Sequence, residues 1–163
     1  KILKEISEPV TDFAKIKNLA EDLIDTCNVS NGAGLAASQI GESKQILVIK
    51  PSAFGLENPE DNDINKDYLI VINPEIIPQG DDVKRWNEQC LSVPNIDVKV
   101  ERKENIILKY FNLNGEEQFL KASWPFSAGL QHEYDHLIGK LVLDRCNKKL
   151  KSFYVKRYHK RNK

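Results

Sequence analysis

The segment LQHEYDHLIG, residues 130–139, contains two histidines four positions apart, with a glutamate directly after the first. Residues i and i+4 of an α-helix lie on one face, one turn apart, so His132 and His136 would point the same way. Two imidazoles arranged like this can bind a metal ion, and Glu133 completes an HExxH pattern. The pattern raises two questions, namely which residue is the third ligand and what a metal would do there.

The residues around this pattern predict a buried helix over 125–139. Leu130, Leu137 and Ile138 are apolar, and Pro125 suits the first turn of a helix. A polar side chain that is buried without a partner costs several kcal/mol. A metal ion would give both imidazoles a partner, which favours a metal site over an accidental pattern.

The third ligand can be sought by elimination. One extended pattern, HExxHxxGxxH, would place it at Val142, which cannot bind a metal, and no glutamate follows Glu133. Asp135 and Asp144 remain candidates, although Asp135 lies between the histidines and would tend to face away. Upstream, the thiolate of Cys90 suits Fe(II), Zn, Co or Ni. Two histidines and one cysteine would leave a fourth coordination position open, as in catalytic sites.

The remainder of the chain predicts an α+β fold. Apolar residues recur at helical spacing over 12–28, where Thr11 or Asp12 would be the N-cap, and Asn114-Gly115 is a hairpin turn signal. We expect mainly antiparallel sheets around the central metal-binding helix, with an N-terminal and a C-terminal helix. The other predicted segments are a Gly/Ala-rich loop at 31–41, strands at 45–50, 68–76 and 90–103, a polar surface excursion at 52–67, a hairpin over 104–123 and a last helix from near Asn147.

Length and composition indicate a single globular domain over residues 1–163. Hydrophobic residues make up 40% of the chain and charged residues 29%, and no apolar run approaches the roughly 18 residues of a membrane helix. There are three cysteines and no apolar core of a signal peptide at the N-terminus, so we expect free thiols and a cytoplasmic location. An organellar or viral origin stays open.

The zero net charge hides a basic segment at 147–163. This segment has eight Lys or Arg and no Asp or Glu, which leaves 16 basic and 24 acidic residues elsewhere. Such a tail or helix suits contact with phosphate backbones, although a solvated helix end would look the same.

Three blocks of sequence resemble one known family, the peptide deformylases. They are GAGLAASQ at 32–39, EQCLS at 88–92 and QHEYDH at 131–136, in the family's order and spacing. LIGKLVLDR at 137–145 and the opening LKEISEPV fit as well, so the resemblance covers nearly the whole chain. One departure stands out, because Gln89 replaces the glycine of the second block, whose backbone lies beside the substrate in the family.

The resemblance implies a hydrolase of protein biosynthesis that processes N-termini co-translationally. It would release formate from the N-terminal formyl-methionine of nascent chains by means of a metal-activated water. The divalent metal would most often be Fe(II), with Zn, Ni or Co in purified samples. The implied roles are metal binding for Cys90, His132 and His136, proton transfer for Glu133, and oxyanion stabilisation for the side chain of Gln39 and the backbone N–H of Leu91.

The resemblance also implies how the peptide would bind. The backbone of Gly34 would pair with the substrate as with an added strand, and Gln89 would affect substrate contacts or loop shape. Glu88 would also form an ion pair with Arg102. The positions expected around the methionine side chain are Ala33, Trp86, Glu88, Pro125, Ala128 and Gly129.

Other readings predict different behaviour. A small endopeptidase built on the same helix would cleave internal peptide bonds and would not need Cys90. A non-catalytic relative that binds formylated N-termini or the ribosome would not need Glu133. If the chain is a deformylase, the basic tail would be a candidate for binding ribosomal RNA.

Overall fold

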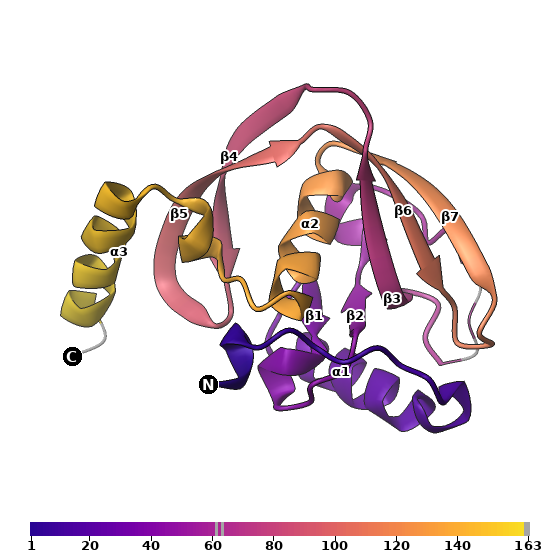
Figure 1. Ribbon diagram of the computed structural model, residues 1–163. Coiled ribbons are helices and arrows are strands. Elements are labelled where there is room, and N and C mark those ends of the chain that lie inside the picture. The colour runs from indigo at the N-terminus through magenta and orange to yellow at the C-terminus, as the bar shows by residue number, and fades with distance from the viewer. Residues whose placement is uncertain (61, 63, 162–163) are drawn as a thin grey trace.

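The computed structural model describes residues 1–60, 62 and 64–161 of the chain, and shows two antiparallel β-sheets with a helix between them (Figure 1). Residues 61 and 63 of the predicted excursion and 162–163 of the basic tail lie outside the described residues. The strands are β1 (Gly34–Ala36), β2 (Ile46–Ile49), β3 (Leu69–Pro78), β4 (Val83–Cys90), β5 (Val93–Lys103), β6 (Asn105–Phe111) and β7 (Glu117–Ser123). The α-helices are α1 (Lys17–Val29), α2 (Phe126–Leu137) and α3 (Lys148–Arg161), and short 3-10 helices cover Ile2–Lys4, Phe13–Lys15, Ala37–Ile40, Pro51–Phe54 and Val142–Arg145.

The larger sheet has the strand order β1-β2-β3-β6-β7, and the smaller one consists of β4 and β5. Every pairing between named strands is antiparallel, as expected. Helix α2 packs against β1, β2 and β7 on one side and against β5 on the other. The metal-binding helix is therefore held between the two sheets, which confirms the predicted α+β arrangement around it.

Three apolar clusters hold these layers together. Helix α1 buries Ala20, Leu23, Ile24 and Cys27 against one face of the larger sheet. Helix α2 buries Phe126, Leu130 and Leu137 against the other face of that sheet. The third cluster joins the inner faces of β4 and β5 to Val142 and to Tyr154 of α3. Both histidines therefore sit on a helix whose orientation is fixed by packing.

The predicted boundaries differ from the structure mainly at the ends of elements. The first helix begins at Lys17, after a separate 3-10 turn, and neither Thr11 nor Asp12 caps it. The Gly/Ala-rich segment contains the short strand β1 and a 3-10 turn, and is not only a loop. Strand β4 was not predicted, because residues 83–89 are mostly polar. The predicted polar excursion begins with a 3-10 helix whose Phe54 packs against the apolar cluster around α2.

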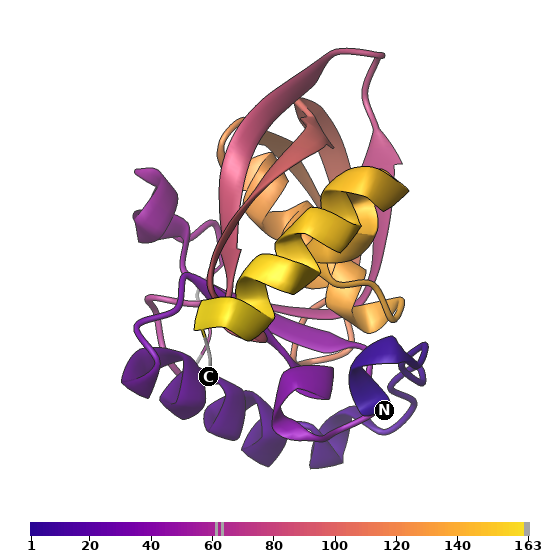
Figure 2. The same cartoon turned by 90° about the vertical axis from the view of Figure 1, so that its left-hand side faces the viewer.

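Helix α3 lies along the outer side of β5 (Figure 2). The backbone N–H of Lys99 donates to the Tyr154 hydroxyl at 3.4 Å, and Tyr158 packs against the same cluster. The Asp144 carboxylate bonds both Lys4 and Lys151, linking the N-terminal segment to α3. Among the helices described, none has the length and apolar character that crossing a membrane requires.

Candidate metal centre

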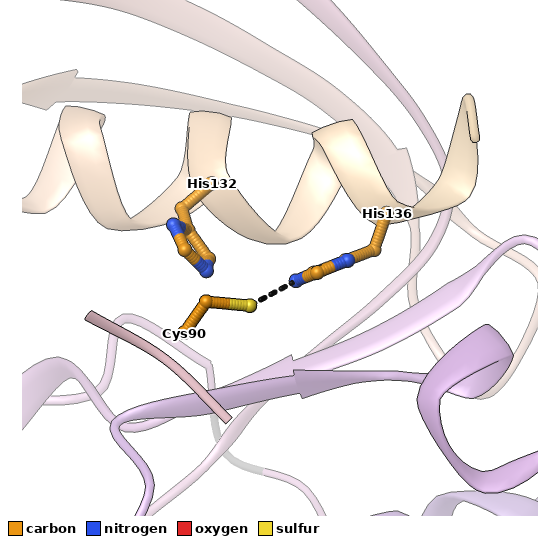
Figure 3. Close-up of side chains that lie close together, drawn as sticks. All are labelled: Cys90, His132 and His136. Carbon is orange, nitrogen blue, oxygen red and sulfur yellow. Dashed lines mark hydrogen bonds between the residues drawn. The ribbon is translucent and has the colours of Figure 1, made fainter. Parts of the chain in front are cut away.

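Cys90, His132 and His136 meet at one point between the smaller sheet and α2 (Figure 3). Cys90 is the last residue of β4, and the histidines occupy successive turns of α2. One ligand atom from each residue lies within 4.8 Å of the others, and Cys90 Sγ is 3.4 Å from His136 Nε2. These are the three ligands that the family resemblance implied. Asp144, one of the two alternatives, is instead held by Lys4 and Lys151.

A carboxylate fixes the orientation of the first histidine. His132 Nδ1 lies 2.8 Å from Glu88 Oε2, so it can donate its hydrogen there while Nε2 faces the cysteine side. Hydrogen bonding of this kind behind a ligand is common in metal sites, because it sets the tautomer and raises the basicity of the ring. Glu88 therefore contacts a metal-ligand candidate in addition to lining the cavity.

Glu88 is anchored by a buried ion pair. Arg102 donates to both of its carboxylate oxygens, at 2.7 and 2.8 Å, and also to Asp135 at 2.6 Å. All three side chains are 2% exposed, so each charge depends on the others for its partners. The other alternative ligand, Asp135, is thus engaged by Arg102 and also by Arg145. The expected Glu88–Arg102 pair is present and belongs to a larger network.

The charged and polar groups around the three ligand candidates favour a positive charge at His132. Burial would lower the pKa of His132, but its contacts with Cys90 and Glu88 outweigh burial and raise that pKa to about 10. At His136, by contrast, burial dominates, so it lowers the pKa to about 3 and keeps the ring neutral. His136 Nδ1 is buried and has no hydrogen-bond partner. A thiol, a neutral imidazole and a second imidazole that attracts positive charge suit a divalent cation.

Glu133 lies beside the three ligand candidates and is 7% exposed. Burial raises its pKa to about 7, and its Oε2 atom has no hydrogen-bond partner. Its side chain passes directly over Gly34, where an added Cβ would lie 2.9 Å from Oε1. A buried carboxylate with a free oxygen and a pKa near neutrality can both accept and return a proton.

Gln39 and Leu91 line the same cavity as Cys90 and Glu133. The Gln39 side chain accepts from the backbone N–H of Ala36 at 2.9 Å and donates to the Ser92 hydroxyl at 3.1 Å. These two bonds fix the plane of the amide, which lines the same cavity as Cys90 and Leu91. The side-chain amide of Gln39 is therefore held rigidly beside the ligand candidates.

A cavity of about 840 Å³ opens onto Cys90, His132 and Glu133, whereas His136 is not among its lining residues. Of the residues expected around the methionine side chain, Ala33, Trp86, Glu88, Pro125 and Gly129 line it. Ala128 does not, because it faces the interior and is 0% exposed. Sequence reasoning missed further lining residues. They include Ile49 at the end of β2, Ala53 and Phe54 in the 3-10 helix after it, and Pro94, Asn95 and Asp97 near the start of β5.

Gln89, which departs from the family pattern, lies at the rim of this cavity. Its side-chain amide donates to Asp97 Oδ1 at 2.8 Å across the paired strands, and both side chains are exposed. Strand pairing shifts register between Glu88 and Cys90, so Gln89 occupies the irregular position. The extra side chain thus changes the rim and leaves Cys90 in place.

Comparison with known proteins decides the family. A model of the polypeptide deformylase family matches residues 1–152. The chain belongs to the peptide deformylase family. The peptide deformylase of Bartonella bacilliformis is 37% identical over 164 residues, covering 99% of this chain and 88% of that protein. The peptide deformylase of Rickettsia akari is 38% identical over 145 residues, covering 87% of this chain and 80% of that protein.

Solved peptide deformylase structures share the fold. The enzyme from Ehrlichia chaffeensis has a TM-score of 0.83 at 32% identity, covering 100% of this chain and 92% of that one. The enzyme from Legionella pneumophila has a TM-score of 0.84 at 29% identity, covering 99% and 89%. Peptide deformylases remove formyl groups from nascent polypeptides, so this chain is a metal-dependent amide hydrolase of that class.

Proposed function

We propose that this chain hydrolyses the formyl group from the N-terminal formyl-methionine of nascent polypeptides and releases formate. The observation that carries the proposal is the meeting of the Cys90 thiol and two imidazoles beside a buried glutamate, at the wall of an open cavity. A site for structure alone would not need a carboxylate with a pKa near 7 at the same point.

Cys90, His132 and His136 would hold one divalent cation. When bound, such a cation supplies Lewis-acid chemistry and lowers the pKa of a coordinated water toward neutrality. The mixed thiolate and imidazole donor set suits Fe(II), which we propose as the working metal, and it would also accept Zn, Ni or Co. Glu88, 2.8 Å from His132 Nδ1, would hold the ring in the tautomer that leaves Nε2 available to the metal.

Glu133 would act as the proton carrier. Its unpartnered Oε2 would take a proton from the attacking water, and the protonated carboxyl would then pass it to the departing amine. Burial supports this role, because a carboxyl group whose pKa is raised to about 7 holds a proton long enough to return it.

Gln39 and Leu91 would stabilise the negative oxygen that forms during attack. The bonds to Ala36 and Ser92 hold the Gln39 amide in place before substrate arrives, so little reorganisation is needed. We propose the backbone N–H of Leu91 as the second donor. Loss of one donor of this type typically lowers kcat by about 10²–10³.

The peptide would bind along β1. This strand is at an edge of the larger sheet, where it pairs with β2, and Ala33 and Gly34 line the cavity. An extended substrate can add to such an edge through backbone hydrogen bonds. The apolar part of the cavity, near Trp86, Pro125 and Gly129, would take the methionine side chain.

The test is formate release from a formyl-Met peptide, with and without a chelator. We expect activity that needs metal and that falls about 10²–10⁴-fold in Glu133→Ala. The variant Glu117→Ala, at an exposed carboxylate on β7, is the control and should keep wild-type activity. Full activity in Glu133→Ala would contradict the proposed base, and cleavage of internal peptide bonds would favour an endopeptidase instead.

We also propose that α3 binds ribosomal RNA through its outward face. Lys149, Lys156 and Lys160 are exposed, whereas Tyr154 and Tyr158 pack inward. Truncation after Cys146 would therefore also uncover the smaller sheet, and substitution is the cleaner test. Replacing these three lysines by Glu should abolish salt-sensitive co-sedimentation with ribosomes.

The matched control for this test keeps the net charge the same. It carries Lys15→Glu, Lys17→Glu and Lys121→Glu, all exposed and away from α3. If both triple variants lose binding equally, the effect is one of overall charge, and the proposed role of α3 is wrong.

A further inference from the structure

Two residues in the lining of the cavity complement each other. Gly129 has no side chain, and the ring of Phe54 fills the space next to it. A Cβ added at Gly129 would lie 2.4 Å from Phe54 Cζ and 2.9 Å from Cε1. Ile49 Cδ1 would be 3.2 Å away. No β-carbon fits at residue 129 while the ring stays where it is.

Gly129 belongs to the reactive face of α2. Residues separated by three or four positions share one face of a helix. Gly129 therefore lies one turn before His132 and Glu133, and the rise along the helix from Gly129 to Glu133 is about 6 Å. Pro125 lies one turn earlier still, and all four residues line the cavity. The Phe54 ring, which contacts the Gly129 position, therefore borders the cavity about one helical turn from the reacting groups.

The ring is held firmly by its surroundings. It packs on Phe126 of α2 with ring centroids 5.5 Å apart, and the 3-10 helix Pro51–Phe54 starts from the buried Pro51 directly after β2. The backbone N–H of Lys50 donates to the carbonyl of Ala33 at 2.8 Å, tying this segment to the start of β1. The ring thus forms a wall and is not a loose surface side chain.

We propose that Phe54 is a specificity-determining residue, whose ring closes the slot for the substrate's first side chain in place of a side chain at residue 129. The proposal rests on the proposed function, and it names the substrate class that the slot selects. Between the rings of Phe54 and Trp86, the slot takes a flexible, unbranched side chain such as methionine or norleucine. It excludes an aromatic side chain, because the Phe54 ring already fills the space beside Gly129.

The first experiment compares formyl-Met, formyl-norleucine and formyl-Phe peptides with wild type and Phe54→Ala. In the variant, kcat/KM for formyl-Phe relative to formyl-Met should rise at least about tenfold, because hydrophobic slots discriminate by factors of this size. Phe54→Leu should give an intermediate ratio, and serves if Phe54→Ala does not fold. Phe119→Ala, on the exposed face of β7, should leave the ratio unchanged. An unchanged ratio in both Phe54 variants would overturn the proposal.

The second experiment exchanges the side chains across the contact. Gly129→Ala should lose most activity toward formyl-Met, because its Cβ meets the ring at 2.4 Å. The double variant Phe54→Ala with Gly129→Ala should regain activity, since the new methyl group then has room. If the activity loss of the double variant equals the product of the losses of the two single variants, the two residues do not share one slot. That result would also overturn the proposal.

The two experiments distinguish a failure of the proposed function from a failure of the proposed role of Phe54. If wild type releases no formate from any formylated peptide in the presence of metal, the proposed function itself has failed. If wild type is active and the Phe54 variants keep its selectivity, only the role of Phe54 is wrong.

Discussion

At the scale of single residues, the contact between Gly34 and Glu133 decides how the proposed base is placed. An added Cβ at Gly34 would lie 2.9 Å from both Cγ and Oε1 of Glu133. The glycine is therefore needed for the room it leaves above β1, in addition to any pairing of its backbone with substrate.

This close contact predicts the effect of Gly34→Ala. The methyl group would push the Glu133 carboxylate from its place, and we expect kcat to fall about 10²-fold or more, as when a general base is misplaced. Metal content should stay at the wild-type level, because Cys90, His132 and His136 are untouched. Steady-state kinetics with metal analysis checks this. An unchanged kcat would show that the carboxylate can work from a second position.

The same scale shows which site residues could be predicted from the sequence. His132 and His136 carry their own spacing signal. Cys90 was one of several candidates for the third ligand, and the family resemblance singled it out. Phe54 carries no such signal, because it lies in a polar segment and reaches the cavity only through the path of the chain after β2. The bond from Gln89 to Asp97 could not be foreseen either, since it depends on strand register.

At the scale of elements, the hydrophobic pattern predicted the helices and strands that bury one whole face. Helix α2, strands β2 and β3 and the β6–β7 hairpin all appear near their expected places. Strand β4 was missed because its residues 83–87 are all exposed or half-buried, so it has little apolar alternation to detect. Its partner β5 alternates regularly between buried and exposed residues, and the sequence predicted it.

Asp144 joins three elements, and its ionisation should govern how they hold together. Burial would raise its pKa, but the ammonium groups of Lys151 and Lys4 outweigh burial and lower the pKa to about 2. Because the folded pKa is lower than the unfolded value near 3.9, the stabilisation is complete above pH 4 and is lost as the pH falls through 2.

The prediction is a comparison of wild type with Asp144→Asn. The carboxylate is partly screened by water, so we expect it to contribute about 1 kcal/mol at pH 7. The difference in unfolding free energy between the two proteins should shrink toward zero below pH 2 to 3. Urea unfolding between pH 2 and pH 7 measures it. A difference that does not change with pH would assign the effect to the backbone N–H of Leu141, which also donates to this side chain.

At the scale of the whole molecule, the metal centre spans the boundary between the two halves of the fold. Cys90 comes from the smaller sheet, whereas both histidines come from the helix that backs onto the larger one. The sequence predicted which residues would meet, but not that they would join separate apolar clusters. A cation bound there would link the clusters, so metal binding and folding should depend on each other.

Metal removal should therefore lower thermal stability. A ligand present at a thousand times its Kd stabilises the native state by about 4 kcal/mol, and less if the unfolded chain also binds it. For a chain of this length, each kcal/mol changes Tm by about 2–4 °C, so a chelator should lower Tm by about 5–15 °C. Cys90→Ser should melt at nearly the same temperature with and without chelator, whereas Cys146→Ser should respond like wild type. If wild type carrying one equivalent of metal melts at the same temperature after chelation, the cation does not hold the two halves together.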